Sequence, residues 1–210
     1  MNTEALGEAG QCHRLLLIRE TCKHRSFQPL ASSPMASPAS LHWLLEPHMK
    51  LMDQLQPLGE VEIVAGLTLV PVTPQRVETF VACEHSLRER RVGPALKEHL
   101  DRFGTALAAM AIDNGVAVGC VRARLFHEYD PSLETILVSY IGVSPSHRNR
   151  GIGSHMIGHL ARSFLACSRL FNVAAEVATT NDPSLRAFAK NGFSPIGCRE
   201  GKVILSANRC

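Results

Sequence analysis

The stretch from residue 143 to residue 156 constrains the fold more than any other part of the chain. It follows an apolar run, residues 135–143, that is rich in β-branched residues and is therefore typical of a buried strand. After it, apolar residues recur on a single helical stripe from Ile152 to Leu165. The sequence thus predicts a strand, a tight basic loop and a helix in direct succession.

The loop has the composition of an anion-binding site. Gly151 and Gly153 stand where the helix is expected to begin, and glycine there lets a ligand approach the backbone. The first N–H groups of a helix have no partner within it, and with the helix dipole they favour a phosphate. Arg148 and Arg150 add positive charge, and residues 141–175 contain four arginines but no acid. We therefore expect nothing near the loop to repel a phosphate.

Two common nucleotide-binding loops do not fit this stretch. The P-loop requires Lys after its last glycine, whereas Ser154 follows Gly153. The Rossmann fingerprint requires a third glycine, and Met156 stands in its place. What remains is Arg-x-x-Gly-x-Gly over residues 148–153, a pattern that is also compatible with an ordinary turn carrying solvated arginines.

This pattern resembles the pyrophosphate-binding motif of the GNAT superfamily of acyl-CoA-dependent N-acetyltransferases. Residues 175–193 resemble a later motif of the same family: a strand ending in Glu-Val, an Asn after it, a short helix, and then Gly-Phe. The matching positions are Val177, Asn181, Ser184, Lys190, Gly192 and Phe193. Two motifs in the right order, with room between them for one helix and one strand, are more specific than either alone. The resemblance covers residues 60–207.

The resemblance implies an α/β fold in which a mixed central sheet with splayed middle strands is flanked by helices. The residues themselves predict a hairpin at Asn114-Gly115 and a helix that begins at Pro74 with Thr73 as its cap. Strands are expected over residues 61–72, 106–112, 116–126, 135–143, 172–178, 193–198 and 202–207. Helices are expected over residues 74–92, 95–103, 152–165 and 183–191.

Residues 1–58 differ from the rest and are interpreted as a disordered leader that precedes an acetyltransferase domain at residues 59–210. Proline and serine are concentrated in residues 29–47, which breaks regular structure, and a short helix is expected between Pro47 and Leu55. A mitochondrial presequence is an alternative, against which Glu4 and Glu8 speak. Translation from Met35 or Met49 is another.

Composition excludes several classes of protein. The chain of 210 residues is 45% hydrophobic and 20% charged, which is enough for a full core. A net charge of +3 does not indicate nucleic-acid binding, and the apolar run at residues 15–18 is too short to span a membrane. The seven cysteines are odd in number, scattered and without a Cys-x-x-Cys pair, which argues against a disulfide framework or zinc site and predicts a cytoplasmic protein.

The resemblance implies acetyl-CoA as co-substrate and no metal. The residues expected to hold it are Ile141, Gly142, Val143, Arg148, Asn149, Arg150, Gly151, Ile152, Gly153, Ser154, Asn181 and Phe188. The first three would act through the backbone of the splayed strand. His147 is expected to flank the phosphate, and His155 and His159 to form a solvated helix face, because no acid or cysteine near them would complete a metal site.

The general base is expected to be Glu176. Two places on the central strand where family members often carry a Glu or His hold Leu137 and Ser139 here, whereas some members use the Glu of the Glu-Val pair. Glu134 is the second candidate. Alternatively, it and two other acids of residues 127–134, a segment without Lys or Arg, attract a cationic amine or form an ordinary polar loop.

The general acid is where the sequence departs from the family. A Tyr commonly follows the motif's Asn on the short helix, and Phe188, which has no donor, stands in its place. Strand alternation should turn Tyr140 away from the face of Ser139 unless a bulge intervenes. We therefore expect water to protonate the leaving thiolate.

The function that the resemblance implies is N-acetyltransfer, in which a primary amine attacks acetyl-CoA directly in a ternary complex. The alternative is a non-catalytic acyl-CoA-binding sensor or partner-binding module of the same fold, because the usual catalytic residues are missing. The amine could belong to a small molecule or to a protein or peptide. Neither nucleic acid nor a membrane is an expected partner, and a homodimer remains open.

Overall fold

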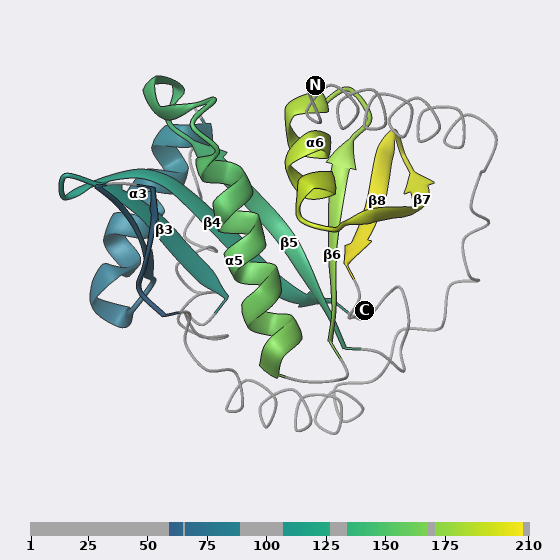
Figure 1. Ribbon diagram of the computed structural model, residues 1–210, viewed down its shortest axis with the longest axis horizontal. Coiled ribbons are helices and arrows are strands. Elements are labelled where there is room, and N and C mark those ends of the chain that lie inside the picture. Colours follow the sequence, from purple (N-terminus) through teal and green to yellow (C-terminus); the bar gives the residue numbers. More distant parts are fainter. Residues whose placement is uncertain (1–58, 65, 89–106, 127–133, 168–170, 208–210) are drawn as a thin grey trace, which may run out of the picture.

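The computed structural model describes residues 59–64, 66–88, 107–126, 134–167 and 171–207. They form an eight-stranded sheet in the order β1-β2-β3-β4-β5-β6-β8-β7 (Figure 1). The strands are β1 (Val61–Val64), β2 (Leu67–Pro71), β3 (Ala108–Asp113), β4 (Val116–Phe126), β5 (Glu134–Val143), β6 (Phe171–Ala178), β7 (Ser194–Arg199) and β8 (Lys202–Ala207). The helices are η1 (Pro74–Arg76), α3 (Val77–Arg88), η2 (Pro145–His147), α5 (Ile152–Cys167) and α6 (Asp182–Lys190).

The middle of the sheet splays, as the fold class predicted. β5 and β6 are parallel, whereas all other neighbouring strands described are antiparallel. Their pairing runs from Glu134 opposite Phe171 to Val138 opposite Ala175 and then stops, although both strands continue. The sheet is therefore mixed and parted at its centre, with helices on both faces, and the predicted α/β fold is confirmed.

The apolar stripe of α5 decides which face of the sheet it covers. Its predicted inward residues are buried, and they pack with α6 against one face of the sheet. These residues are Ile152, Met156, Ile157, Leu160, Ala161 and Phe164. Helix α3 lies on the other face, where Phe80 and Val77 pack against β2, β3 and β4 (Figure 1). Two apolar layers therefore enclose the sheet.

The first predicted strand, residues 61–72, is wrong in one respect: it is a hairpin of β1 and β2. Val64 lies opposite Leu67, and Gly66 has a φ of 76°, a left-handed conformation that glycine adopts without steric cost. The N–H of Gly66 donates to Oε1 of Glu62 at 3.0 Å. Apolar residues on both sides of this turn hid it in the sequence.

The predicted helix at Pro74 begins as the single 3₁₀ turn η1 and continues as α3. Thr73 is the N-cap residue, as predicted, and has an extended conformation, but its side chain makes no capping hydrogen bond. The β3–β4 hairpin is confirmed, since Asn114 and Gly115 both have positive φ, as a type I′ turn requires. The predicted helix at 95–103, most of the acidic segment and the leader lie outside the described residues.

The cysteines do not all follow expectation. Cys83 in α3 and Cys120 in β4 are buried and form no disulfide. Cys198 in β7 is disulfide-bonded, so the expectation of reduced cysteines is wrong at this position. None of the described helices is long and apolar enough to cross a membrane.

Candidate active site

A β-bulge in β5 shapes the centre of the site. Arg122 of β4 lies opposite Tyr140, and Ala123 lies opposite Val138, so Ser139 is an extra residue in β5. Its Oγ donates to the carbonyl oxygen of Arg122 at 3.2 Å. A bulge of this kind interrupts the alternation of side chains.

The bulge therefore corrects the expectation for Tyr140. Ser139 lines a pocket with Arg122, and Tyr140 packs with the α3-side cluster, so both lie on the α3 face of the sheet. A Cβ added at Gly142 would lie 2.5 Å from the Tyr140 hydroxyl, which shows how closely the phenol covers this glycine. Strand alternation in the sequence carries no signal for such an insertion.

The backbone of Ile141 and Val143 faces the splay. These residues lie opposite Val121 and Gly119, and the next hydrogen bond of this ladder joins Ser144 N–H to the Val118 carbonyl at 2.8 Å. Because hydrogen-bonded and non-bonded pairs alternate, the N–H and C=O groups of Ile141 and Val143 point away from β4. They point toward the side from which β6 has diverged.

The loop between β5 and α5 is held from within. Arg148 donates from Nε to the Val143 carbonyl at 3.1 Å, and Gly151 has a φ of 77° at the start of α5. That positive φ, rather than crowding, is the structural reason for a glycine at residue 151, because a Cβ there would meet His155 only at 3.6 Å. Asn149 has a φ of 63°, which asparagine tolerates better than most residues.

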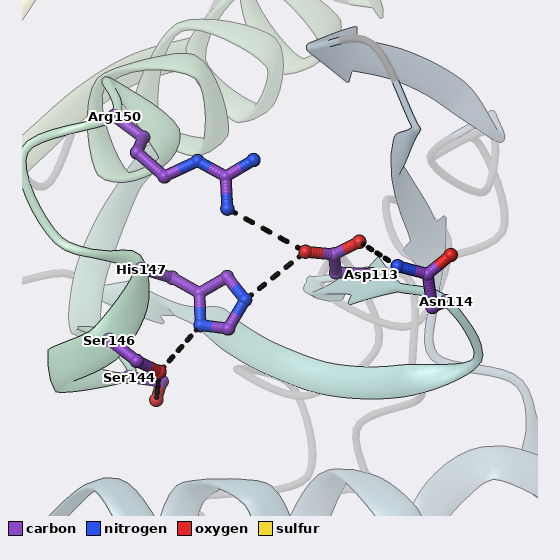
Figure 2. A network of polar contacts seen from close by, with 6 residues as sticks. All are labelled: Asp113, Asn114, Ser144, Ser146, His147 and Arg150. Atoms are coloured by element: carbon purple, nitrogen blue, oxygen red, sulfur yellow. Dashed lines mark hydrogen bonds and ion pairs between the residues drawn. The ribbon is translucent and has the colours of Figure 1, made fainter.

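An acid from a distant hairpin reaches this loop (Figure 2). Oδ2 of Asp113, at the end of β3, lies 3.1 Å from Nε2 of His147 and 3.6 Å from Nη1 of Arg150. Ser146 Oγ lies 2.9 Å from the other ring nitrogen of His147. The expectation that no acid lies near the loop is therefore wrong, and His147 joins the loop to the hairpin.

Asn181 and Phe188 have different roles in helix α6. Asn181 caps α6, with its Oδ1 accepting from the Ser184 N–H at 3.2 Å. Phe188 is 2% exposed and lies edge-on to Phe193 with ring centroids 4.9 Å apart. The described structure therefore gives the Phe188 ring a core partner and little surface for a ligand.

Ser154 is joined to the end of α6. Asn191 donates from Nδ2 to the carbonyl and to Oγ of Ser154, both at 2.9 Å. A Cβ at Gly158 would collide with the Asn191 side chain, so the close approach of α5 and α6 requires glycine there. This contact fixes α6 against the first turns of α5.

Glu176 lies in a basic pocket of about 380 Å³ on the α3 face of the splay. Its Oε1 lies 3.2 Å from Nη2 of Arg199, and its Oε2 lies 3.3 Å from Nζ of Lys202. Its side chain is 18% exposed. The charged and polar residues that line the pocket are Arg122, Arg124, Ser139, Glu176 and Lys202.

The structure separates the two candidate bases. Glu176 directly follows Ala175, the last β6 residue that pairs with β5, so it lies at the splay. Glu134 begins β5, four residues before Val138, which places it about 13 Å along the strand from the splay at ~3.3 Å per residue. Position thus favours Glu176.

Sequence reasoning missed the cations of the pocket and Asp113. Arg122 and Arg124 alternate with Val121 and Ala123, a pattern that does place two arginines on one face of a strand. Asp113 carried no comparable signal, because its approach to residue 147 depends on the order of strands in the sheet.

The two histidines of α5 differ in environment. His155 is exposed, whereas His159 is half-buried, and its Nε2 has no partner among the described residues. Burial, and secondarily the nearby Arg162, lowers the pKa of His159 below its usual value. Within the described part of the chain no three His, Cys, Asp or Glu side chains gather as a metal would need.

Several solved structures have the same fold as this chain. Arabidopsis thaliana Naa50 with a bisubstrate analogue is 18% identical over 69% of this chain and 99% of its own, with a TM-score of 0.56. Arabidopsis thaliana NAA60 with acetyl-CoA is 16% identical over 68% and 99%, with a TM-score of 0.58. A putative phosphinothricin N-acetyltransferase is 23% identical over 69% and 99%, with a TM-score of 0.53.

Sequence comparison defines the family. No curated protein sequence matches the chain. The model of the acetyltransferase (GNAT) family, however, matches residues 75–193, from the turn before α3 to the end of the second motif. That match spans more than half of the chain, and the chain therefore belongs to the GNAT acetyltransferase family.

Proposed function

We propose that the protein is an acetyl-CoA-dependent N-acetyltransferase that moves an acetyl group to a primary amine by direct attack in a ternary complex. The observation that carries the proposal is the parting of β5 and β6 after Val138 and Ala175. The anion-binding type of loop at Gly151 lies at one side of this opening, and the pocket of Glu176 lies at the other. The acetyl donor and the amine would therefore meet from opposite faces of the sheet.

Groups of this chain suit acetyl-CoA. The backbone of Ile141 and Val143, turned toward the splay, matches the amide groups of a pantetheine arm, and Gly142 lies between them. The N-terminal turn of α5 offers N–H donors from Ile152, Gly153 and Ser154 to a pyrophosphate. Bound in this way, the co-substrate supplies an activated acetyl thioester, and the products of transfer are an amide and a free thiol.

Three residues that precede Gly151 would help to hold the pyrophosphate in this proposal. Arg148 and Arg150 would add charge, and Asn149 would add a hydrogen-bond donor. Arg150 is 43% exposed and 3.6 Å from Asp113, a weak contact that phosphate could replace. The Asn181 cap would hold α6 beside the same opening, and Phe188 would support it from the core rather than by contact with the ligand.

Glu176 would remove the proton from the attacking ammonium, directly or through water. Both carboxylate oxygens are engaged by cations, Arg199 and Lys202, so acceptance of a proton requires one of these contacts to loosen. A water molecule between the amine and Glu176 would spare that rearrangement. Glu134 remains the second candidate, at a greater distance along β5.

Water would protonate the leaving thiolate. Phe188 has no donor and lies in the core, and a thiol has a pKa of about 8.5, which makes a side-chain acid dispensable near neutral pH. Tyr140 is a candidate to replace water in this role, because the bulge turns it to the α3 face.

Because both carboxylate oxygens of Glu176 contact cations, a second function is also considered. It is that of an acyl-CoA-binding sensor or partner-binding module without chemistry. One experiment separates the two. Purified protein is mixed with acetyl-CoA and a panel of amines that includes polyamines, amino acids, aminoglycosides and peptide N-termini. Free thiol is followed, and products are identified by mass spectrometry. Transfer to any amine establishes the enzyme, whereas acetyl-CoA binding without thiol release establishes the module. A cytoplasmic location and a homodimer stay predictions.

A further inference from the structure

An acid of the β3–β4 hairpin lies beside the loop that is proposed to hold the pyrophosphate. Asp113 is the last residue of β3, and its side chain is 19% exposed. Its Oδ2 lies 3.1 Å from Nε2 of His147 and 3.6 Å from Nη1 of Arg150, both of which belong to the loop (Figure 2). A carboxylate has the same sign of charge as a phosphate, so the two attract the same cation and repel each other.

The carboxylate of Asp113 does not depend on Arg150 for its position. Its Oδ1 accepts a hydrogen bond from Nδ2 of the neighbouring Asn114 at 3.0 Å. Its Oδ2 accepts one from His147, because an ionised carboxylate only accepts and Nε2 must therefore donate. The other ring nitrogen of His147 lies 2.9 Å from Ser146 Oγ, which fixes the orientation of the ring. Asp113 therefore keeps two hydrogen bonds when Arg150 leaves it.

Arg150 is the loosely held member of this group. Its side chain is 43% exposed, and its separation of 3.6 Å from Oδ2 of Asp113 is too long for a hydrogen bond. Ion pairs at exposed positions contribute little to stability, so a phosphate can displace Asp113 from Arg150 with little loss. Arg148, by contrast, donates from Nε to the Val143 carbonyl at 3.1 Å. Arg150 is therefore the loop arginine whose contact is with an anion.

We infer that Asp113 sets the affinity for acetyl-CoA by competing with the pyrophosphate for Arg150. This inference rests on the proposed function and adds a positioning residue to its co-substrate site. In the free protein Asp113 holds Arg150. In the complex Arg150 turns to the pyrophosphate, whereas Asp113 stays on its two other donors. The acid thus lowers the affinity for acetyl-CoA and for the product CoA alike, because both carry the same pyrophosphate, and it favours release of the product.

The first test removes the charge of Asp113 and keeps its shape. Asp113→Asn retains an oxygen that can accept from His147, so the loop should keep its conformation. We expect the Kd of acetyl-CoA and of CoA, measured by calorimetry, to fall about 3- to 10-fold. Glu78→Gln, at an exposed position on α3 across the sheet from α5, also removes one negative charge and is the matched control, with an unchanged Kd. An unchanged or raised Kd in Asp113→Asn would overturn the inference.

The second test asks whether the effect passes through Arg150. Arg150→Gln should raise the Kd of acetyl-CoA, and in that background Asp113→Asn should change it by less than about 2-fold, because the cation for which the acid competes is gone. S-acetylpantetheine, an acetyl donor without phosphates, separates this role from a merely structural one. Asp113→Asn should leave the KM of this donor in thiol release unchanged. An equal gain of affinity in both backgrounds, or an equal effect on both donors, would contradict competition for Arg150.

A third test needs no variant, since it uses a crystal structure of the wild-type protein with CoA. We expect Arg150 within hydrogen-bond distance of a phosphate oxygen, with Asp113 still beside His147. Arg150 still paired with Asp113 in the complex would refute the exchange. If the wild-type protein binds acetyl-CoA but Asp113→Asn leaves the Kd unchanged, only this inference fails. If the wild-type protein binds no acetyl-CoA, the proposed function fails with it.

Discussion

The carboxylate of Glu84 in α3 and the guanidinium of Arg122 in β4 form a buried ion pair, with Glu84 0% exposed and the Arg122 side chain 17% exposed. The pair crosses from the helix to the sheet beside the pocket and belongs to residues that are 38 apart in sequence. It joins the packing of α3 to the position of a cation in the candidate acceptor site.

This pair predicts a non-additive response to substitution. Arg122→Leu removes the guanidinium that pairs with the buried Glu84 charge and should lower the free energy of unfolding by about 3–5 kcal/mol. The double variant Arg122→Leu, Glu84→Leu should lose markedly less, because no unpaired charge remains. Urea denaturation of the two single variants and the double variant measures this coupling, and additive losses would show that the pair has no special energetic role.

The cofactor proposal predicts a charge effect at Gly151. Gly151→Asp puts a negative charge where the pyrophosphate should lie, so the thermal stabilisation by acetyl-CoA should fall by several degrees or vanish. Gly151→Asn is the control, because Asn has nearly the same size and tolerates the positive φ but carries no charge. Undiminished stabilisation of the Asp variant by acetyl-CoA would refute a phosphate site at the start of α5.

The role of Glu176 predicts a selective loss of turnover. Glu176→Gln should lower kcat about 10²- to 10⁴-fold, the usual range for a positioned base, and should leave the affinity for acetyl-CoA unchanged. Glu134→Gln, at the far end of the β5–β6 pair, should change kcat little. A loss in both affinity and turnover, or a larger loss in the Glu134 variant, would move the base away from Glu176.

The bulge in β5 allows a test of whether water or Tyr140 protonates the leaving thiolate. If water protonates the thiolate, Tyr140→Phe should change kcat by less than a few-fold even though the phenol lies on the α3 face. A collapse of kcat with intact acetyl-CoA binding would show that Tyr140 is the acid. Phe188→Tyr would bury a hydroxyl in the core and should cost about 1–3 kcal/mol of stability.

The lowered pKa of His159 predicts an acid-side loss of stability. Burial, and then Arg162, disfavours the charged imidazole in the folded state, so the folded pKa lies below the unfolded value near 6.5. Between the two pKa values the unfolded chain therefore binds more protons than the folded chain. The stability that is present above pH 6.5 is lost as the pH falls through the folded pKa. His159→Gln should reduce the stability difference between about pH 7.5 and about pH 5.5, whereas His155→Gln, at an exposed position, should not. Denaturation at both pH values checks this.

The sequence alone determined the elements whose signal is local. The apolar stripe of α5, the type I′ turn at Asn114-Gly115 and the strand–loop–helix at residues 135–165 follow from periodicity and from residues that favour a positive φ. The two family motifs then predicted the splay of β5 and β6, and the structure has it. Glycine at residue 66 was equally local, yet the apolar residues around it hid the hairpin.

Tertiary structure decided what depends on register and strand order. The bulge at Ser139 moves Tyr140 to the α3 face, although no residue of β5 signals an insertion. Asp113 reaches the loop of Arg150 only because β3, β4 and β5 are neighbours in the sheet. The charge of the acceptor pocket likewise arises from three separate strands. Side-chain periodicity states which face of a strand a residue occupies, whereas only the assembled sheet determines which faces meet.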